Sequence, residues 1–107
     1  MTIKELRRVG SRLKKAREEK HLNQIQLAEL VHLTDSYIGM IERGERTPSL
    51  ETFLNIINVL EVTADYILCD AVSYGYRVYL EKFEEQIDKL SGKDKEKLVK
   101  IMAAFLE

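Results

Sequence analysis

Apolar residues recur at helical spacing through most of the chain, and this periodicity restricts the fold more than any other feature. Leu6, Val9, Leu13 and Ala16, with Gly10 among them, predict a first amphipathic helix of about five turns. Clean alternation with a period of two is absent, as are the turn dipeptides typical of β-hairpins. The pattern therefore predicts an all-α fold.

Two short helices are predicted next, and each follows a residue suited to capping a helix. Asn23 and Gln26 have the spacing of a capping box, which opens a helix that continues to about residue 31. Thr34 is the capping candidate for a helix over Asp35–Arg43, and Gly44 ends that helix. The tight turn between the two helices has the spacing of a helix-turn-helix motif.

Two further helices complete the first part of the chain. Ser49, directly after Pro48, caps a helix, and Thr63 caps a last short helix that continues to Leu68. The apolar face of the first of these two comprises Phe53, Ile56, Ile57 and Leu60. We therefore expect five helices within residues 1–70.

Residues 71–107 are predicted to form a separate helical hairpin, after a connector at residues 70–75. One apolar helix face has steps of four and three residues and comprises Tyr76, Leu80, Phe83, Ile87 and Leu90. Ser91 and Asp94 form a second capping-box pair. The helix that they open carries Leu98, Ile101, Met102 and Phe105.

Charge is unevenly distributed, although the formal net charge is only −1. Residues 1–20 carry eight basic and three acidic side chains, whereas residues 21–70 carry eight acidic side chains against Arg43 and Arg46. The near-neutral total argues against a histone-like nucleic-acid binder. A nucleic-acid binder that concentrates its positive charge on one face is still compatible with this net charge, provided that residues 1–20 and residues 43–46 come together in space.

Several other classes of protein are not supported by the sequence. The single cysteine, Cys69, excludes an internal disulfide framework, and with two scattered histidines it leaves no plausible zinc site. We expect Cys69 to pack rather than react. No apolar run approaches the length of a membrane span, and the charged N-terminus is no signal peptide. These features predict a cytoplasmic protein without metal or cofactor.

Catalysis has no support either. His32, Asp35 and Ser36 lie close together in sequence, as parts of a nucleophilic site would. Asp35 and Ser36 are explained as first-turn residues of a helix, and His32 as a polar turn residue. A phosphate-binding glycine loop is also absent. We therefore expect no enzyme.

Helical-wheel positions divide the helix Asp35–Arg43 into two faces. Tyr37, Ile38 and Ile41 share one arc, which is the natural core side. The opposite arc comprises Asp35, Ser36, Gly39, Met40 and Arg43. A helix that enters the DNA major groove needs such a face without bulky side chains, because bulk would block approach to the base edges. An ordinary solvated face fits the same pattern, so the wheel alone leaves both readings open.

Arg17 lies in the middle of the apolar stripe of the first helix, where a charge requires a partner. Glu42, at the edge of the inner arc of the third helix, is the best candidate. We expect this pair to be structural and to fix the third helix against the first.

The segments that carry these features resemble the phage repressor/Cro-type helix-turn-helix family, also called XRE-like regulators. The resemblance covers residues 6–69 in the order and spacing of the family and rests on Gly10–Arg17, Leu22–Ala28, Tyr37–Gly44, Arg46–Thr52 and Leu60–Leu68. It implies a five-helix lambda-repressor-like helix-turn-helix domain, here over residues 1–70. It also implies that Asp35–Arg43 is the recognition helix and that Arg17 and Glu42 match the buried ion pair of the family.

The resemblance further implies a set of DNA contacts. Base-facing positions are Asp35, Ser36 and Met40, with Tyr37 and Gly39 beside them. Phosphate-facing positions are Asn23, Gln24, Arg43 and Arg46, to which Arg12 and Lys14 could add contacts from the first helix. Phosphate contacts give affinity and register, whereas base-edge contacts give sequence choice. These positions imply a sequence-specific transcriptional regulator, in particular a repressor, of bacterial or phage type that is nucleoid-associated when bound.

Three residues depart from the family pattern. His32 stands where the family usually has glycine, so either the turn backbone differs or a left-handed histidine is tolerated. Asp35 is acidic at a DNA-facing position. It either accepts a hydrogen bond from a cytosine amino group or interacts favourably with the helix dipole near the N-terminus of its helix. Met40 lacks the side-chain amide expected for reading adenine. It therefore either contacts a thymine methyl group or contributes no sequence specificity.

The hairpin leaves a second class of function open, namely an antitoxin or adaptor that uses this fold to hold a protein partner. Its apolar surface exceeds what two helices can hide by themselves. We expect residues 76–106 to form a homodimer that reads a pseudo-palindromic operator in double-stranded DNA. The alternative is that the hairpin folds back onto the first and fifth helices of its own chain.

Overall fold

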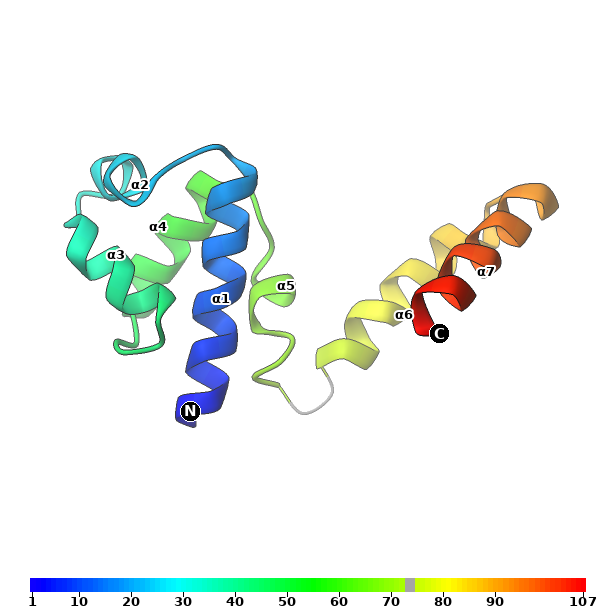
Figure 1. Ribbon diagram of the computed structural model, residues 1–107, viewed down its shortest axis with the longest axis horizontal. Helices are drawn as coiled ribbons and strands as arrows, with labels where there is room; N and C mark the ends of the chain where they lie inside the picture. The colour runs from blue at the N-terminus through cyan, green and yellow to red at the C-terminus, as the bar shows by residue number, and fades with distance from the viewer. Residues whose placement is uncertain (73–74) are drawn as a thin grey trace. The chain divides into compact units, whose positions relative to one another are not determined.

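The computed structural model describes residues 1–72 and 75–107, and all regular structure within these residues is α-helical. The helices are α1 (Ile3–Glu19), α2 (Gln24–Leu30), α3 (Asp35–Glu42), α4 (Leu50–Leu60), α5 (Ala64–Leu68), α6 (Gly75–Asp88) and α7 (Gly92–Leu106) (Figure 1). The chain divides into two compact units, Met1–Gly75 and Tyr76–Glu107. The five-helix domain and the pair of C-terminal helices are as predicted.

Local capping explains where the helices begin. The side chain of Asn23 accepts from the Gln26 amide at 2.7 Å, and Gln26 Oε1 accepts from the Asn23 amide at 2.8 Å. Both bonds of the predicted capping box are therefore present. Thr2 and Glu5 form a further capping box, which was not predicted. It starts α1 one turn before the apolar stripe, and the apolar periodicity did not indicate this earlier start.

The turn between α2 and α3 contains a residue in the left-handed region. His32 has φ +57°, so this histidine occupies the conformation for which the family usually uses glycine. Of the two expectations for this position, the left-handed histidine is confirmed. The tight turn leaves α2 and α3 in contact with each other, in the helix-turn-helix arrangement.

The core of the first unit is formed by side chains from all five of its helices, α1 to α5. Its largest fully buried side chains are Leu13, Leu27, Ile38, Ile56, Leu60 and Ile67. Both α3 and α5 contact α1, and they lie on opposite sides of it (Figure 1). Cys69 is buried at the end of this core, in agreement with a packing role.

Close approach between α1 and α3 depends on a glycine. A Cβ atom at Gly10 would lie 2.8 Å from the carbonyl carbon of Glu42 and closer still to the carbonyl oxygens of Ile41 and Glu42. Real Cβ atoms do not come this close to backbone, so the two helices can pack at this distance only because Gly10 has no side chain. The end of α3 is thereby fixed directly on α1.

In the second unit α7 returns along α6 after a short turn at residues 89–91 (Figure 1). Apolar side chains are widely exposed on both helices, for example Leu80 at 61%, Ile101 at 66% and Phe105 at 86%. The side chain of Tyr76, which belongs to the predicted apolar face, lies outside the described part of the structure. Among the described residues no helix is long and apolar enough to cross a membrane.

Candidate nucleic-acid interface

The predicted base-facing residues of α3 do not share one environment. Asp35 and Ser36 are exposed in the first turn of α3, next to the capping residue Thr34. Met40, one turn further along, is half-buried. Tyr37 is half-buried and packs against the core, which is the inner position that the helical wheel gave it. The N-terminal turn of α3 therefore presents the most accessible polar groups of this helix.

The buried ion pair between α1 and α3 is confirmed. Arg17 Nε donates to Glu42 Oε2 at 2.7 Å and Nη2 donates to Oε1 at 3.1 Å, with only 7% and 8% of the two residues exposed. Arg17 Nη1 also donates to the carbonyl oxygen of Leu22 at 2.8 Å. The hydrogen bonds to Glu42 raise the pKa of the Arg17 guanidinium, against the opposing effect of burial. The pair joins α1, α3 and the start of α2.

Gln24, the first residue of α2, belongs to the same network. Its Nε2 donates to Glu42 Oε1 at 3.0 Å, so the carboxylate that pairs with Arg17 also fixes the amide of Gln24. The resemblance implies that Gln24 contacts phosphate, but nothing in the sequence indicated that Glu42 would orient it. Asn23 next to it is exposed, and its side-chain oxygen is used in the capping box.

Arg43 lies at the C-cap of α3 and is held by its neighbour Glu45. Arg43 Nε donates to Glu45 Oε1 at 2.9 Å and Nη2 donates to Oε2 at 3.2 Å, in a bidentate fork on the surface. This fork raises the pKa of Arg43 and lowers the pKa of Glu45 below its usual value. The sequence gave no indication that Glu45 would hold Arg43 in this way.

Gly39, predicted to lie beside the base-facing residues, is a buried position of α3. It is buried because the side chains of Arg43 and Gln24 lie over it. A Cβ atom at Gly39 would lie 2.9 Å from Arg43 Nη1 and 3.5 Å from Gln24 Nε2. Two residues predicted to contact phosphate are therefore brought together above the middle of α3.

The loop after α3 brings the two basic regions of the sequence together. Gly44 has φ +74°, and a Cβ atom there would lie 2.8 Å from the backbone nitrogen of Arg7 in α1. Arg7 and Arg46 are both exposed, as is Lys14 on α1. The charge distribution left this juxtaposition as a condition for a DNA-binding face, and it did not single out Arg7 as the residue of α1 that lies against the loop.

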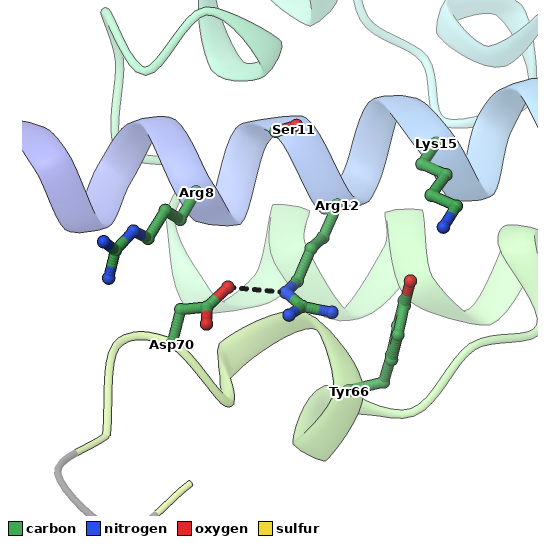
Figure 2. Close-up of a pocket in the computed structure, with 6 residues that line it drawn as sticks. All are labelled: Arg8, Ser11, Arg12, Lys15, Tyr66 and Asp70. Carbon is green, nitrogen blue, oxygen red and sulfur yellow. Dashed lines mark hydrogen bonds and ion pairs between the residues drawn. The ribbon is translucent and has the colours of Figure 1, made fainter. Parts of the chain in front are cut away.

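Arg12, predicted to add a phosphate contact from the first helix, lies on the side of α1 that faces α5. Its Nε donates to Asp70 Oδ2 at 2.7 Å, and its guanidinium carbon lies 4.9 Å from the centroid of the Tyr66 ring (Figure 2). Since α3 and α5 lie on opposite sides of α1, this contact with α5 directs Arg12 away from the recognition helix. We therefore leave Arg12 out of the phosphate contacts proposed below.

Comparison with known proteins identifies the class of this chain. Residues 13–67, which include α2, α3 and the ion pair, match the family described as helix-turn-helix. The chain therefore belongs to the helix-turn-helix family of the repressor/Cro (XRE-like) type.

Among the described residues no cluster of three potential ligands could hold a metal ion.

Individual relatives cover different shares of the chain. The uncharacterized HTH-type transcriptional regulator YqaE of Bacillus subtilis is 31% identical over 99 residues, which cover 89% of this chain and 84% of YqaE. The immunity repressor protein of Bacillus phage phi105 is 40% identical over 60 residues, which cover 56% of this chain but only 42% of the repressor. The solved structure of the restriction-modification controller protein C.AhdI from Aeromonas hydrophila has a TM-score of 0.55 and 37% identity, and covers 58% of this chain and 94% of that chain.

Proposed function

We propose that this protein is a sequence-specific regulator of transcription, acting as a repressor, that places α3 in the major groove of double-stranded DNA. One observation carries the proposal: the buried Arg17–Glu42 pair locks α3 to α1 while Asp35 and Ser36 remain exposed at its N-terminal turn. A rigidly held helix with an exposed N-terminal turn is what major-groove reading requires. The names of its relatives, which include a phage immunity repressor, support the same function.

The residues around α3 divide into two proposed roles. Asp35, Ser36 and Met40 face base edges and set the sequence preference. The proposed phosphate contacts come from Asn23, Gln24, Arg43, Arg46 and Lys14, and we add Arg7 because it is exposed beside the loop. Phosphate contacts hold the protein in register on any duplex, so they contribute affinity without sequence choice.

We expect alanine substitutions to separate these two roles. Arg46→Ala should weaken binding to every duplex by a similar factor and reduce the slope of log K against log salt by about 1. Ser36→Ala and Met40→Ala should instead change the preferred sequence. The measurement is a selection of bound duplexes from a random pool, followed by titration of the selected duplex at several salt concentrations.

The matched control for Arg46→Ala is Lys15→Ala, which removes one exposed positive charge from the side of α1 that faces α5 (Figure 2). It should leave the salt slope nearly unchanged. The recognition-helix assignment is wrong if Ser36→Ala and Met40→Ala both keep the wild-type preference. A protein that holds only a protein partner would select no sequence from the pool at all.

We further propose that residues 76–106 make a homodimer that reads a pseudo-palindromic operator. The exposed apolar faces of α6 and α7 support this assignment, because large exposed apolar patches mark interaction surfaces. Two copies related by a two-fold axis would place their recognition helices about one DNA turn apart.

Deleting residues 76–107 should give a folded monomer that binds a half-site and loses tight binding to the full site. The first unit keeps its whole core in this variant, so a cooperative melting transition should remain. Sedimentation equilibrium measures the loss of the dimer. If the intact protein is already monomeric well above its operator affinity, the tail does not dimerise, and a hairpin folded onto its own chain becomes the better description.

A further inference from the structure

We propose that the hollow between α1 and α5 is a binding site for a small dianion, such as a phosphate monoester or a dicarboxylate. The hollow has a volume of about 270 Å³ and lies within the first unit. It is lined by Arg8, Ser11, Arg12, Lys15, Tyr66 and Asp70 (Figure 2). The inference goes beyond the proposed DNA binding, because α5 lies on the opposite side of α1 from α3 (Figure 1).

Three cationic side chains leave α1 on the same side. Arg8, Arg12 and Lys15 follow one another at steps of four and three residues, which places them on one helix face. Figure 2 shows all three extending to the side of α1 on which α5 lies. Among the described lining residues Asp70 is the one acid, so the lining has a formal charge of +2. A dianion would neutralise this charge.

The hollow already accommodates a carboxylate of the chain itself. Arg12 Nε donates to Asp70 Oδ2 at 2.7 Å, and the two side chains are only 18% and 11% exposed. The Arg12 guanidinium also lies over the ring of Tyr66, with 4.9 Å between its carbon and the ring centroid. It is therefore held from two sides, and a group fixed in advance loses less conformational entropy when a ligand binds.

The two cations that flank this pair have no acidic partner. Arg8 and Lys15 are exposed, and neither forms an ion pair with a residue that the structure describes. Guanidinium groups bind phosphate and carboxylate oxygens with two parallel hydrogen bonds, and a lysine adds a compact positive charge. The volume is slightly below that of pockets for drug-sized ligands, which favours a compact anion.

Titration of the isotope-labelled full chain with inorganic phosphate, followed by NMR, tests the site. The Arg12 Nε–H resonance and the amides around Tyr66 should shift and reach saturation, with a Kd of about 1 mM for so small an ion. Succinate is titrated in parallel, and the tighter ligand identifies the class as phosphate or dicarboxylate. Equal shifts with sodium chloride at the same ionic strength, or no saturation with either dianion, overturn the proposal.

Charge variants locate the bound anion. Arg8→Ala and Lys15→Ala should each weaken phosphate binding by about fivefold, as expected for the loss of one exposed ion pair. Lys20→Ala is the matched control, because it removes an exposed positive charge at the C-cap of α1, outside the hollow. Its affinity should be that of the wild type. An equal loss in Lys20→Ala would mean that only the total charge matters, and the site would be wrong.

Asp70→Asn should have the opposite effect and strengthen phosphate binding by about fivefold. Asparagine keeps a side-chain oxygen that can accept from Arg12 Nε, but it lacks the negative charge that repels an added anion. Glu51→Gln, which removes an exposed negative charge from α4, should leave the affinity unchanged. An affinity in Asp70→Asn that is no higher than that of the wild type overturns the proposal, because an anion in the hollow must be repelled by this carboxylate.

Discussion

Replacing Arg17 by alanine is expected to lower the free energy of unfolding of the first unit by about 3–5 kcal/mol. The substitution leaves Glu42 only 8% exposed and without the guanidinium that pairs with it. An unpaired buried carboxylate is far more costly than the pair is favourable, because its desolvation is no longer compensated. A loss of this size corresponds to a melting temperature lower by more than about 10 °C.

Two variants show whether the buried charge is the cause. Arg17→Met combined with Glu42→Leu should recover most of the lost stability, since apolar side chains of similar volume pack in the same place. Lys20→Ala removes an exposed partner of Glu61 at 3.3 Å and should cost less than about 1 kcal/mol. A wild-type melting temperature in Arg17→Ala would mean that the pair does not hold α3 to α1.

The same double variant separates stability from DNA binding. With Glu42 replaced by leucine, the amide of Gln24 loses the acceptor that fixes it at 3.0 Å. We therefore expect the variant to fold well but to bind DNA more weakly than the wild type. The ion pair thus has two expected consequences, one for the placement of α3 and one for the proposed phosphate contact of Gln24.

Features that depend on neighbouring residues in the sequence were predictable. The capping box of Asn23 and Gln26 is set by two residues three positions apart, and it lies where the pattern indicated. The left-handed His32 could be predicted as one of two options, because its position in a tight turn restricts the backbone. The partner of Arg17 could also be found, since a charge within an apolar stripe needs an opposite charge on the facing helix.

Contacts that depend on how side chains fold over the surface were not predictable. Arg12 is basic and close to Lys14 in sequence, yet the helix turns its side chain towards Asp70 rather than α3. Gly39 lies on the outer arc of α3 but is covered by the long side chain of Arg43 from the next turn. A helical wheel gives the direction in which a residue leaves the helix, and it does not show what folds back across it.

Gly10→Ala is expected to destabilise the first unit by about 2 kcal/mol, although alanine is the better helix former. Alanine gains about 1 kcal/mol over glycine in a helix interior. The added methyl group would press into the backbone of Ile41 and Glu42, and overpacking of this kind costs about 3 kcal/mol where backbone has to move. The steric cost therefore exceeds the gain, and urea denaturation should show a lower midpoint with an unchanged m-value.

Gly39→Ala is the matched substitution for this test, because it lies in the same unit and also in a helix. There the new methyl group meets the end of the Arg43 side chain rather than backbone, so the helix-propensity gain should dominate and stability should rise. Opposite signs for the two alanine substitutions are the expected result. A stability gain for Gly10→Ala would show that α1 and α3 separate easily, and a close backbone contact would then not be what fixes the recognition helix.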